Sequence, residues 1–270
     1  MTDLKVVVAG AGGRMGAAVI AAIAATPGLS LHAALDRQDS PVAGKDVGQL
    51  AGLPPLAIPV TCDSEAALAG ADALIDFTAP TVSVLLAELA APRGLVHVIG
   101  TTGMTAEEDW SIAKAGQAGA RIVKSGNFSL GVNVLAGLVR QASRMLAEYD
   151  IEIVETHHNR KVDAPSGTAL LLGQAAAEGR DIDLDRNSVR GRDGHTGARP
   201  NGTIGFASLR GGTVVGDHTV LLAGPSERIE LTHRAENRSI FAHGALHAAL
   251  WANNQPPGLY GMADVLGFSR

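Results

Sequence analysis

The chain opens with a short apolar run, a glycine-rich turn and an apolar helix, and this order constrains the possible folds more than any other feature. Residues 4–9 read LKVVVA, which is typical of a buried strand. Residues 10–16, GAGGRMG, follow at once, and residues 14–25 repeat apolar side chains at helical spacing until Pro27-Gly28. A strand that passes through glycines into a helix is typical of an α/β fold.

The same alternation continues through the first half of the chain. Further strands are expected at 29–36, 71–77, 95–102 and 120–126, and further helices at 82–90 and 107–119. Only 3% of the residues are aromatic, so the core is expected to pack small aliphatic side chains, as helices laid on a parallel sheet do. These features predict a doubly wound parallel sheet.

The pattern changes after Asn127. A long helix is expected at 131–147, a strand at 151–156, a loop at 180–203, strand-like runs at 203–210, 211–224 and 228–235, and a last helix at 239–252. Strands joined by tight glycine turns predict a second sheet that is mixed and mostly antiparallel. The expected domains are residues 1–127 with 238–270, and residues 128–237.

Charge and cysteine content exclude several classes of protein. A net charge of −5 and a pI near 6.0 give no field that would attract nucleic acid or an anionic membrane, so neither is expected as a partner. Cys62 is the single cysteine, so the chain can form no internal disulfide and no thiolate zinc site. No apolar run approaches the roughly 18 residues of a membrane span, and no signal peptide is evident. A cytoplasmic location is expected.

The glycine turn predicts a dinucleotide site. Gly10 and Gly12 match the first two glycines of GxGxxG, while Met15 occupies the third position. Gly13 and Gly16 must then allow the close packing of turn and helix. Glycines let a pyrophosphate approach the amides of a helix N-terminus, where the helix dipole favours negative charge. An ordinary glycine turn in an α/β fold is the alternative.

Two side chains after the second strand bear on the cofactor. Asp36 lies about twenty residues beyond the glycine turn, where an acid commonly binds the ribose hydroxyls of NAD. Arg37, its neighbour, or Arg14 in the turn could pair with the 2′-phosphate of NADP. The sequence therefore predicts that both NADH and NADPH are used. GTTG at 100–103 and SGNF at 125–128 close two further strands and are expected to line the same crevice.

Residues 157–169, HHNRKVDAPSGTA, carry the densest polar chemistry of the chain. His157 and His158 can move protons near neutral pH, and Lys161 can bind an anion or act as an acid. Ser166 precedes a helical run, so it is expected to cap that helix and to leave the Gly167 and Thr168 amides as donors for a carboxylate.

Adjacent histidines on a regular strand point to opposite faces. We therefore expect the chain to become irregular between Thr156 and Pro165 if both are to reach one substrate. A charged surface loop before a capped helix is the alternative interpretation. The spacing of His157, His158 and Asp163 does not fit a helical zinc site, and no metal is expected.

These motifs together resemble the dihydrodipicolinate reductase family. The resemblance runs nearly end to end, through VVVAGAGGRMG, IDFT, IGTTG, NFSLGVN, ETHHNRKVDAPSGTA, RDGHTG, GTIGFASLRGG, VVGDHT and FAHGALHAALW. It implies a Rossmann-type domain completed by the C-terminal tail, with an inserted α/β domain that binds substrate and forms a homotetramer through its sheet.

The resemblance also implies residue roles. His157 resembles the family's proton donor and acceptor, Lys161 its proton donor, His158 a substrate ligand, and Gly167 and Thr168 the holders of a substrate carboxylate. The implied contacts of NADH or NADPH are Gly10, Ala11, Gly12, Gly13, Arg14, Met15, Asp36, Arg37, Gly100, Thr101, Thr102, Ser125, Gly126, Asn127 and Phe128.

The implied reaction is the NAD(P)H-dependent reduction of 4-hydroxy-tetrahydrodipicolinate, through dihydrodipicolinate, to tetrahydrodipicolinate in the diaminopimelate route to lysine. The substrate is a small cyclic dicarboxylate. One alternative is a Rossmann dehydrogenase of another amino-acid precursor, and a second is a nicotinamide-binding sensor without catalysis. Neither explains the HHNRKVDAPSGTA segment.

Overall fold

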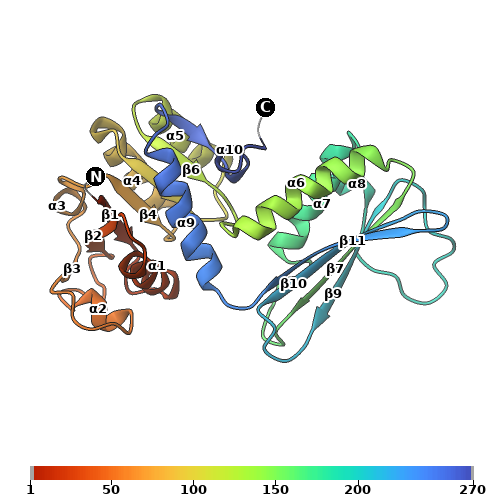
Figure 1. The fold of residues 1–270 in the computed structure, drawn as a ribbon, viewed down its shortest axis with the longest axis horizontal. Coiled ribbons are helices and arrows are strands. Elements are labelled where there is room, and N and C mark those ends of the chain that lie inside the picture. Colours follow the sequence, from red (N-terminus) through yellow and green to blue (C-terminus); the bar gives the residue numbers. More distant parts are fainter. Residues whose placement is uncertain (1–2, 269–270) are drawn as a thin grey trace. The chain divides into compact units, whose positions relative to one another are not determined.

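A computed structural model describes residues 3–268, and it divides into two compact units. One unit contains the chain up to Ser129 together with the chain from Ser239 onward, and the other is Leu130–Arg238. The borders expected from the sequence are 127/128 and 237/238. The second unit is thus an insertion into the first, as the predicted fold class requires, and each unit has its own sheet (Figure 1).

The first unit is built on a seven-stranded sheet in the order β12-β6-β5-β4-β1-β2-β3, and every pairing in it is parallel. Its strands are β1 (Leu4–Ala9), β2 (Leu29–Leu35), β3 (Val60–Thr61), β4 (Ala73–Asp76), β5 (Val96–Ile99), β6 (Arg121–Lys124) and β12 (Gly258–Tyr260). Its helices are α1 (Arg14–Ala25), α2 (Val47–Leu50), α3 (Ser64–Leu68), α4 (Pro80–Ala90), η1 (Ala91–Arg93), α5 (Ala106–Gln117), α9 (Ser239–Ala252) and α10 (Met262–Val265). The predicted doubly wound sheet is confirmed.

Helices cover both faces of this sheet (Figure 1). On one face, α3, α4 and α5 bury side chains such as Leu68, Leu86 and Ile112 against alternate strand residues. On the other, α1 packs on β1 and β2, and α9 packs on α1 and on the central strands β4, β5 and β6. Because the helix surfaces are mostly Ala, Val, Leu and Ile, the layers pack with small aliphatic contacts, as the low aromatic content predicts.

The second unit places two long helices on a five-stranded sheet in the order β11-β10-β7-β9-β8 (Figure 1). Its elements are α6 (Leu130–Met145), β7 (Asp150–His157), α7 (Gly167–Gly179), α8 (Leu184–Asn187), β8 (Ser188–Val189), β9 (Ile204–Arg210), β10 (Gly216–Ala223) and β11 (Arg228–Ala235). Side chains at alternate positions of β7 and β10, including Ile151, Ile153 and Val220, form the core beneath α6 and α7.

The second sheet is mixed, as predicted. β10 runs antiparallel to β7 and β11, whereas β9 pairs parallel with both β7 and β8. The parallel pairs arise because the chain returns from β7 to β9 through α7, and parallel strands need such a crossover. The expected loop at 180–203 contains two short elements, α8 and β8, which the sequence analysis did not predict.

Candidate active site

The glycine turn after β1 is held tightly against the start of α1. Gly10 has φ +74, in the left-handed region that favours glycine, and a Cβ on Gly16 would lie 2.3 Å from the backbone oxygen of Gly10. A Cβ on Gly13 would lie 3.2 Å from the same oxygen. Gly16 therefore allows the close approach of helix and turn that the third glycine of the motif usually permits, as the sequence analysis expected.

The N-terminus of α1 is open to an anion. Gly13 is the N-cap and provides no side-chain hydrogen bond, and the first turn of α1 contains no acid. Gly12, Gly13 and Arg14 are exposed there. Exposed amides, a favourable helix dipole and a cation at one helix start fit a pyrophosphate, so the turn suits a dinucleotide cofactor.

Asp36 lies against the same turn, directly after β2. Its Oδ2 accepts a hydrogen bond from the Gly12 N–H at 2.7 Å, and its Oδ1 accepts one from the Arg37 N–H at 2.8 Å. The Arg37 side chain is 71% exposed and its Nε lies 3.2 Å from Oδ1 of Asp39. The acid is thus placed at the glycine turn, while the arginine beside it extends into solvent.

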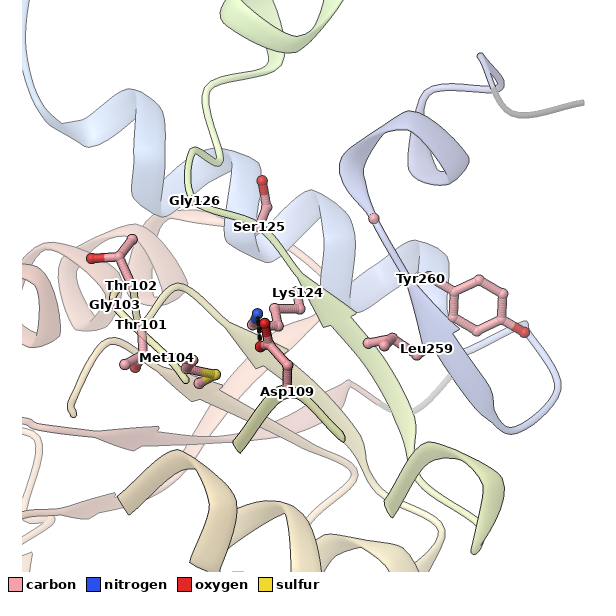
Figure 2. Close-up of a pocket in the computed structure, with 11 residues that line it drawn as sticks. Thr101, Thr102, Gly103, Met104, Asp109, Lys124, Ser125, Gly126, Leu259 and Tyr260 are labelled. Carbon is pink, nitrogen blue, oxygen red and sulfur yellow. Dashed lines mark hydrogen bonds and ion pairs between the residues drawn. The ribbon is translucent and has the colours of Figure 1, made fainter. Parts of the chain in front are cut away.

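The ends of β5 and β6 border an open cavity of about 530 Å³ (Figure 2). The predicted residues Thr101, Thr102, Ser125 and Gly126 line it. Lys124 and Asp109 form an ion pair at its wall, and Leu259, Tyr260 and Gly261 from the C-terminal segment complete it. The sequence analysis missed the C-terminal contribution, because β12 has only three residues.

Not every predicted cofactor residue has an accessible side chain. Phe128 is 1% exposed and packs edge-on against Phe77, with ring centroids 5.8 Å apart. Thr101 is 6% exposed and its hydroxyl accepts a hydrogen bond from Ser83 at 2.8 Å. Ala11 and Asn127 are buried as well, and Met15 is half-buried. The side chains of these residues belong mainly to the packed core beneath the carboxyl edge of the sheet.

Gly100 has a steric reason to be glycine. A Cβ there would lie 2.1 Å from the Phe77 ring, so no larger residue fits between the end of β5 and the segment after β4. The carboxyl ends of β1, β2, β4, β5 and β6 therefore carry Gly10, Asp36, Phe77, Gly100 and Ser125 along one edge of a parallel sheet. Ligands bind at this edge in open α/β sheets.

His157 is the last residue of β7 and is only 9% exposed. It shares the helix-covered face of the sheet with Glu155, because side chains two residues apart on a strand lie on one face. Its Nδ1 lies 2.5 Å from Oε2 of Glu155. Among the described residues its other ring nitrogen, Nε2, makes no hydrogen bond.

Glu155 is 1% exposed and is paired by Arg210 of β9. Nη1 and Nη2 of Arg210 each donate to one carboxylate oxygen at 2.8 Å. Burial acts to raise the pKa of Glu155, but hydrogen bonds from Arg210, His157 and Ser208 outweigh it and lower that pKa to about 2. Glu155 is therefore an anion at neutral pH.

His158 leaves the strand, and the irregular path predicted between Thr156 and Pro165 is confirmed. Its N–H donates to the Val214 carbonyl at 2.8 Å, and Asn159 and Arg160 form a turn. Its Nε2 lies 3.5 Å from Nη2 of Arg238. Partial burial and the charges of Arg160 and Arg238 lower the pKa of His158, which favours the neutral ring.

Lys161 is paired within its own loop. Its Nζ donates to both carboxylate oxygens of Asp163 at 2.8 Å, and its side chain is 18% exposed. The hydrogen bond from Lys161 lowers the pKa of Asp163. The lysine charge is thus locally balanced, which the sequence analysis did not foresee because it treated Asp163 only as a possible metal ligand.

The start of α7 has the predicted cap. Ser166 Oγ accepts from the Ala169 N–H at 3.1 Å, and the first turn contains no acid. Gly167 is exposed and Thr168 half-buried at this helix start. Ser166 Oγ also lies 2.9 Å from Nε2 of His218 on β10, whose pKa is lowered by burial, and then by the charge of His157, to about 4.

Four residues around the histidines were not predicted: Glu155, Arg210, His218 and Arg238. Glu155 had a signal, since it precedes His157 by two positions in a strand. Arg210, His218 and Arg238 lie more than fifty residues away in sequence and reach the site through strand pairing and the end of the insertion.

Within residues 3–268, no three His, Cys, Asp or Glu side chains are arranged to hold a metal ion. No helix of that part of the chain has the length and apolar character needed to cross a membrane.

Family models match both parts of the chain. The model described as dihydrodipicolinate reductase, N-terminus, matches residues 4–128, and the model described as dihydrodipicolinate reductase, C-terminus, matches residues 131–266. The matched ranges together take in nearly every described residue.

Curated relatives give the same result. The 4-hydroxy-tetrahydrodipicolinate reductase of Rhodopseudomonas palustris (strain BisB18) is 60% identical over 270 residues, covering 100% of this chain and 99% of that protein. The reductase of the same name from Rhizobium rhizogenes is 59% identical over 268 residues, covering 98% and 97%. A dipicolinate-bound dihydrodipicolinate reductase from Paenisporosarcina sp. TG-14 has the same fold, with a TM-score of 0.80 at 23% identity over 97% of this chain and 99% of that one. The chain belongs to the dihydrodipicolinate reductase family.

Proposed function

We propose that this reductase converts dihydrodipicolinate, the cyclic unsaturated dicarboxylate formed when 4-hydroxy-tetrahydrodipicolinate loses water, to tetrahydrodipicolinate with NADH or NADPH. The observation that carries the proposal is the second-unit cluster: His157, Lys161 and the N-terminus of α7 lie within one short segment, and Glu155 holds the histidine. Neither a different amino-acid dehydrogenase nor an inactive sensor requires this combination.

The substrate carries two negative charges, and the second unit offers several groups that suit them. The exposed Gly167 at the start of α7 places backbone donors where the helix dipole favours a carboxylate. Lys161 is already bound to one carboxylate, that of Asp163, so a substrate carboxylate can compete for the same Nζ. His158, neutral and beside Arg238, adds a hydrogen-bonding ring and a cation.

The first unit supplies the cofactor site. The amides at the start of α1 would hold the pyrophosphate, and Asp36 would bind the ribose hydroxyls. The wall of the cavity at the ends of β5 and β6 is formed in part by Thr101, Thr102, Ser125 and Gly126 (Figure 2). When bound, NADH or NADPH supplies a hydride from its dihydronicotinamide ring. Arg37 and Arg14 are exposed cations that would suit the 2′-phosphate of NADPH, while Asp36 suits NADH, and this pairing supports use of both.

Reduction also needs a proton. His157 can deliver the proton from Nε2, because its Nδ1 is engaged with Glu155. Lys161, in the loop after β7, is the second proposed proton donor. The remaining contribution of the chain is orientation: His157 lies at the end of β7, Lys161 in the loop that follows, and the proposed carboxylate-binding amides at the capped start of α7.

The test is an assay of the purified protein with the condensation product of aspartate-semialdehyde and pyruvate. Oxidation of NADH or NADPH is expected, measured by the loss of dihydronicotinamide absorbance. His157→Ala and Lys161→Ala should each lower kcat by about 10²–10⁴-fold, while the cofactor Kd stays within about twofold of wild type. If the protein binds NADH but oxidises neither cofactor, the proposed function is wrong and the alternative of a nicotinamide-binding sensor without catalysis is favoured.

A homotetramer and a cytoplasmic location complete the proposal. Val154, Ala207, Leu209 and Leu221 share the face of the second sheet opposite the helix-covered one, and Leu209 is 52% exposed. These side chains form an apolar patch on a face that also carries Glu152, Thr156 and Thr219, and an exposed apolar patch with polar surroundings is typical of a protein interface. The single cysteine, half-buried and free, supports a reducing compartment.

A further inference from the structure

Glu155 is a buried charge that the proposed reaction does not use directly. Its Oε2 lies 2.5 Å from Nδ1 of His157 and accepts from Nη1 of Arg210 at 2.8 Å. Its Oε1 accepts from Nη2 of Arg210 at 2.8 Å and from the Ser166 N–H at 3.3 Å. A carboxylate buried to this degree needs such partners, and here its partners include the proposed proton donor and the cap of α7.

We propose that Glu155 is a positioning residue for the reduction: it holds His157 with its proton on Nδ1 and its Nε2 free for proton transfer, and it ties that ring to the start of α7. The inference rests on the proposed role of His157. Glu155 itself touches neither substrate nor cofactor in this proposal.

The tautomer follows from the charge of Glu155. An ionised carboxylate only accepts hydrogen bonds, so the short contact to Nδ1 requires His157 to donate from that nitrogen. The pKa of Glu155, lowered to about 2, keeps the carboxylate ionised throughout the neutral range. In a neutral imidazole Nε2 is then the nitrogen without a proton, and it is the atom that can take up and release one.

The neighbours of His157 support this orientation. Arg210 on β9 balances the charge of Glu155, and the His218 ring on β10 packs edge-on against the His157 ring with centroids 5.1 Å apart. His218 stays neutral, because burial lowers its pKa to about 4. Gly216 leaves room for the ring, since a Cβ there would lie 2.9 Å from Nε2 of His157. Lys161 and Asp163, in the loop after β7, are the other charged pair near the cluster, and Nη2 of Arg210 donates to the Asp163 carbonyl at 2.7 Å.

The second oxygen of Glu155 connects the histidine to the proposed anion site. Oε1 holds the N–H of Ser166, and Ser166 in turn caps α7 through Ala169. The carboxylate of Glu155 therefore fixes the position of both the His157 ring, which delivers the proton, and the start of α7, which is proposed to bind a carboxylate of the substrate. Loss of the carboxylate should reduce kcat mainly, with a smaller rise in the KM of the dicarboxylate.

The test compares Glu155→Gln and Glu155→Asp with Glu152→Gln in the full-length enzyme. Glu152 is a matched control: it lies on the same strand, faces the opposite side of the sheet, and is also paired by arginines, Arg192 and Arg199. The measurements are kcat, KM, the pH dependence of kcat, thermal unfolding, and the tautomer of His157 by ¹⁵N NMR of histidine-labelled protein, assigned from the His157→Gln spectrum.

Glu155→Gln should lower kcat on the order of tenfold to a hundredfold. This loss is smaller than the one expected for removing His157, because the proton donor itself is still present. It should also weaken the preference of His157 for the Nδ1–H tautomer. Because an anion that favours the imidazolium is gone, the alkaline limb of the kcat profile, where the proton donor loses its proton, should shift to lower pH. Glu155→Asp keeps the charge but shortens the side chain, so kcat should fall while the alkaline limb stays near its wild-type position. Glu152→Gln should change none of the three.

Two results separate the possible failures. Wild-type kcat in His157→Gln would overturn the proposed role of His157, and the inference with it. A large loss in His157→Gln together with wild-type kcat and tautomer in Glu155→Asp and Glu155→Gln would overturn the inference alone. If removing the buried charge leaves Glu155→Gln unfolded, Glu155→Asp decides the matter, since it retains the pair with Arg210.

Discussion

At the scale of single residues, three histidines of the second unit have different electrostatic surroundings. His157 has an anion beside its ring, His158 has Arg160 and Arg238, and His218 is 3% exposed next to His157. The sequence analysis recognised the His157-His158 pair and the geometric conflict between them. His218 was not predicted, because nothing in its own segment shows that β10 pairs with β7 and places it beside His157.

His218 predicts an acid-sensitive contribution to stability. Burial lowers its pKa from 6.5 to about 4, so between these values the unfolded chain binds a proton that the folded chain does not. The stabilisation is complete above about pH 6.5 and is lost as the pH falls to about 4, on the order of 3 kcal/mol. Urea unfolding from pH 7 to pH 4 should show the unfolding free energy falling more steeply in wild type than in His218→Gln. Parallel curves for the two proteins would contradict the prediction.

At the scale of elements, the glycine turn and α1 act as one piece. The sequence analysis predicted β1 and α1 with the bounds that the structure has, because apolar periodicity is strong in both. The same method missed α2, β3, α3, β12 and α10, which have two to five residues each. Elements this short are held by tertiary contacts, such as the pairing of β12 with β6, and their local sequences carry too little periodicity to identify them.

The close approach of α1 to the turn predicts a graded effect of two glycine substitutions. Gly16→Ala would place a Cβ 2.3 Å from the Gly10 oxygen and 2.8 Å from Cα of Ala11, both backbone atoms, whereas Gly13→Ala would place it 3.2 Å from that oxygen. Gly16→Ala should lower the unfolding free energy by about 1–3 kcal/mol and weaken NADH binding, and Gly13→Ala should do both to a smaller extent. Calorimetric titration and urea unfolding measure the two effects. Equal NADH affinity in wild type and Gly16→Ala would contradict the expected role of the packing.

At the scale of the whole molecule, the C-terminal segment returns to the first unit after the insertion. α9 buries Ala245, Leu246 and Ala249 in that unit, and β12 adds the edge strand beside β6. The resemblance to a known family led to this expectation, whereas apolar periodicity at 239–252 predicted only a helix. Nothing in that helix specifies which sheet it covers, since its apolar surface would suit several partners.

The proposed tetramer predicts different effects for two equally exposed leucines. Leu209 lies on the helix-free face of the second sheet and Leu85 on α4 of the first unit, and each is 52% exposed. Wild type should sediment at four times the 27.6 kDa mass of one chain. Leu209→Asp should give smaller species, because it places a charge in an apolar interface, while Leu85→Asp should sediment as wild type does. Equal sedimentation of all three proteins would argue against assembly through this face.

Local pattern was sufficient for the parts of this protein that depend on neighbours in sequence. The main strands and helices, the glycine turn, the Ser166 cap and the break after His157 all follow from periodicity, backbone preference and side-chain chemistry within a few residues. Partners that pair across the sheet were decided by tertiary structure alone. Arg210 and His218 meet Glu155, His157 and Ser166 only because β9 and β10 flank β7, and the strength of those contacts comes from burial that no single segment produces.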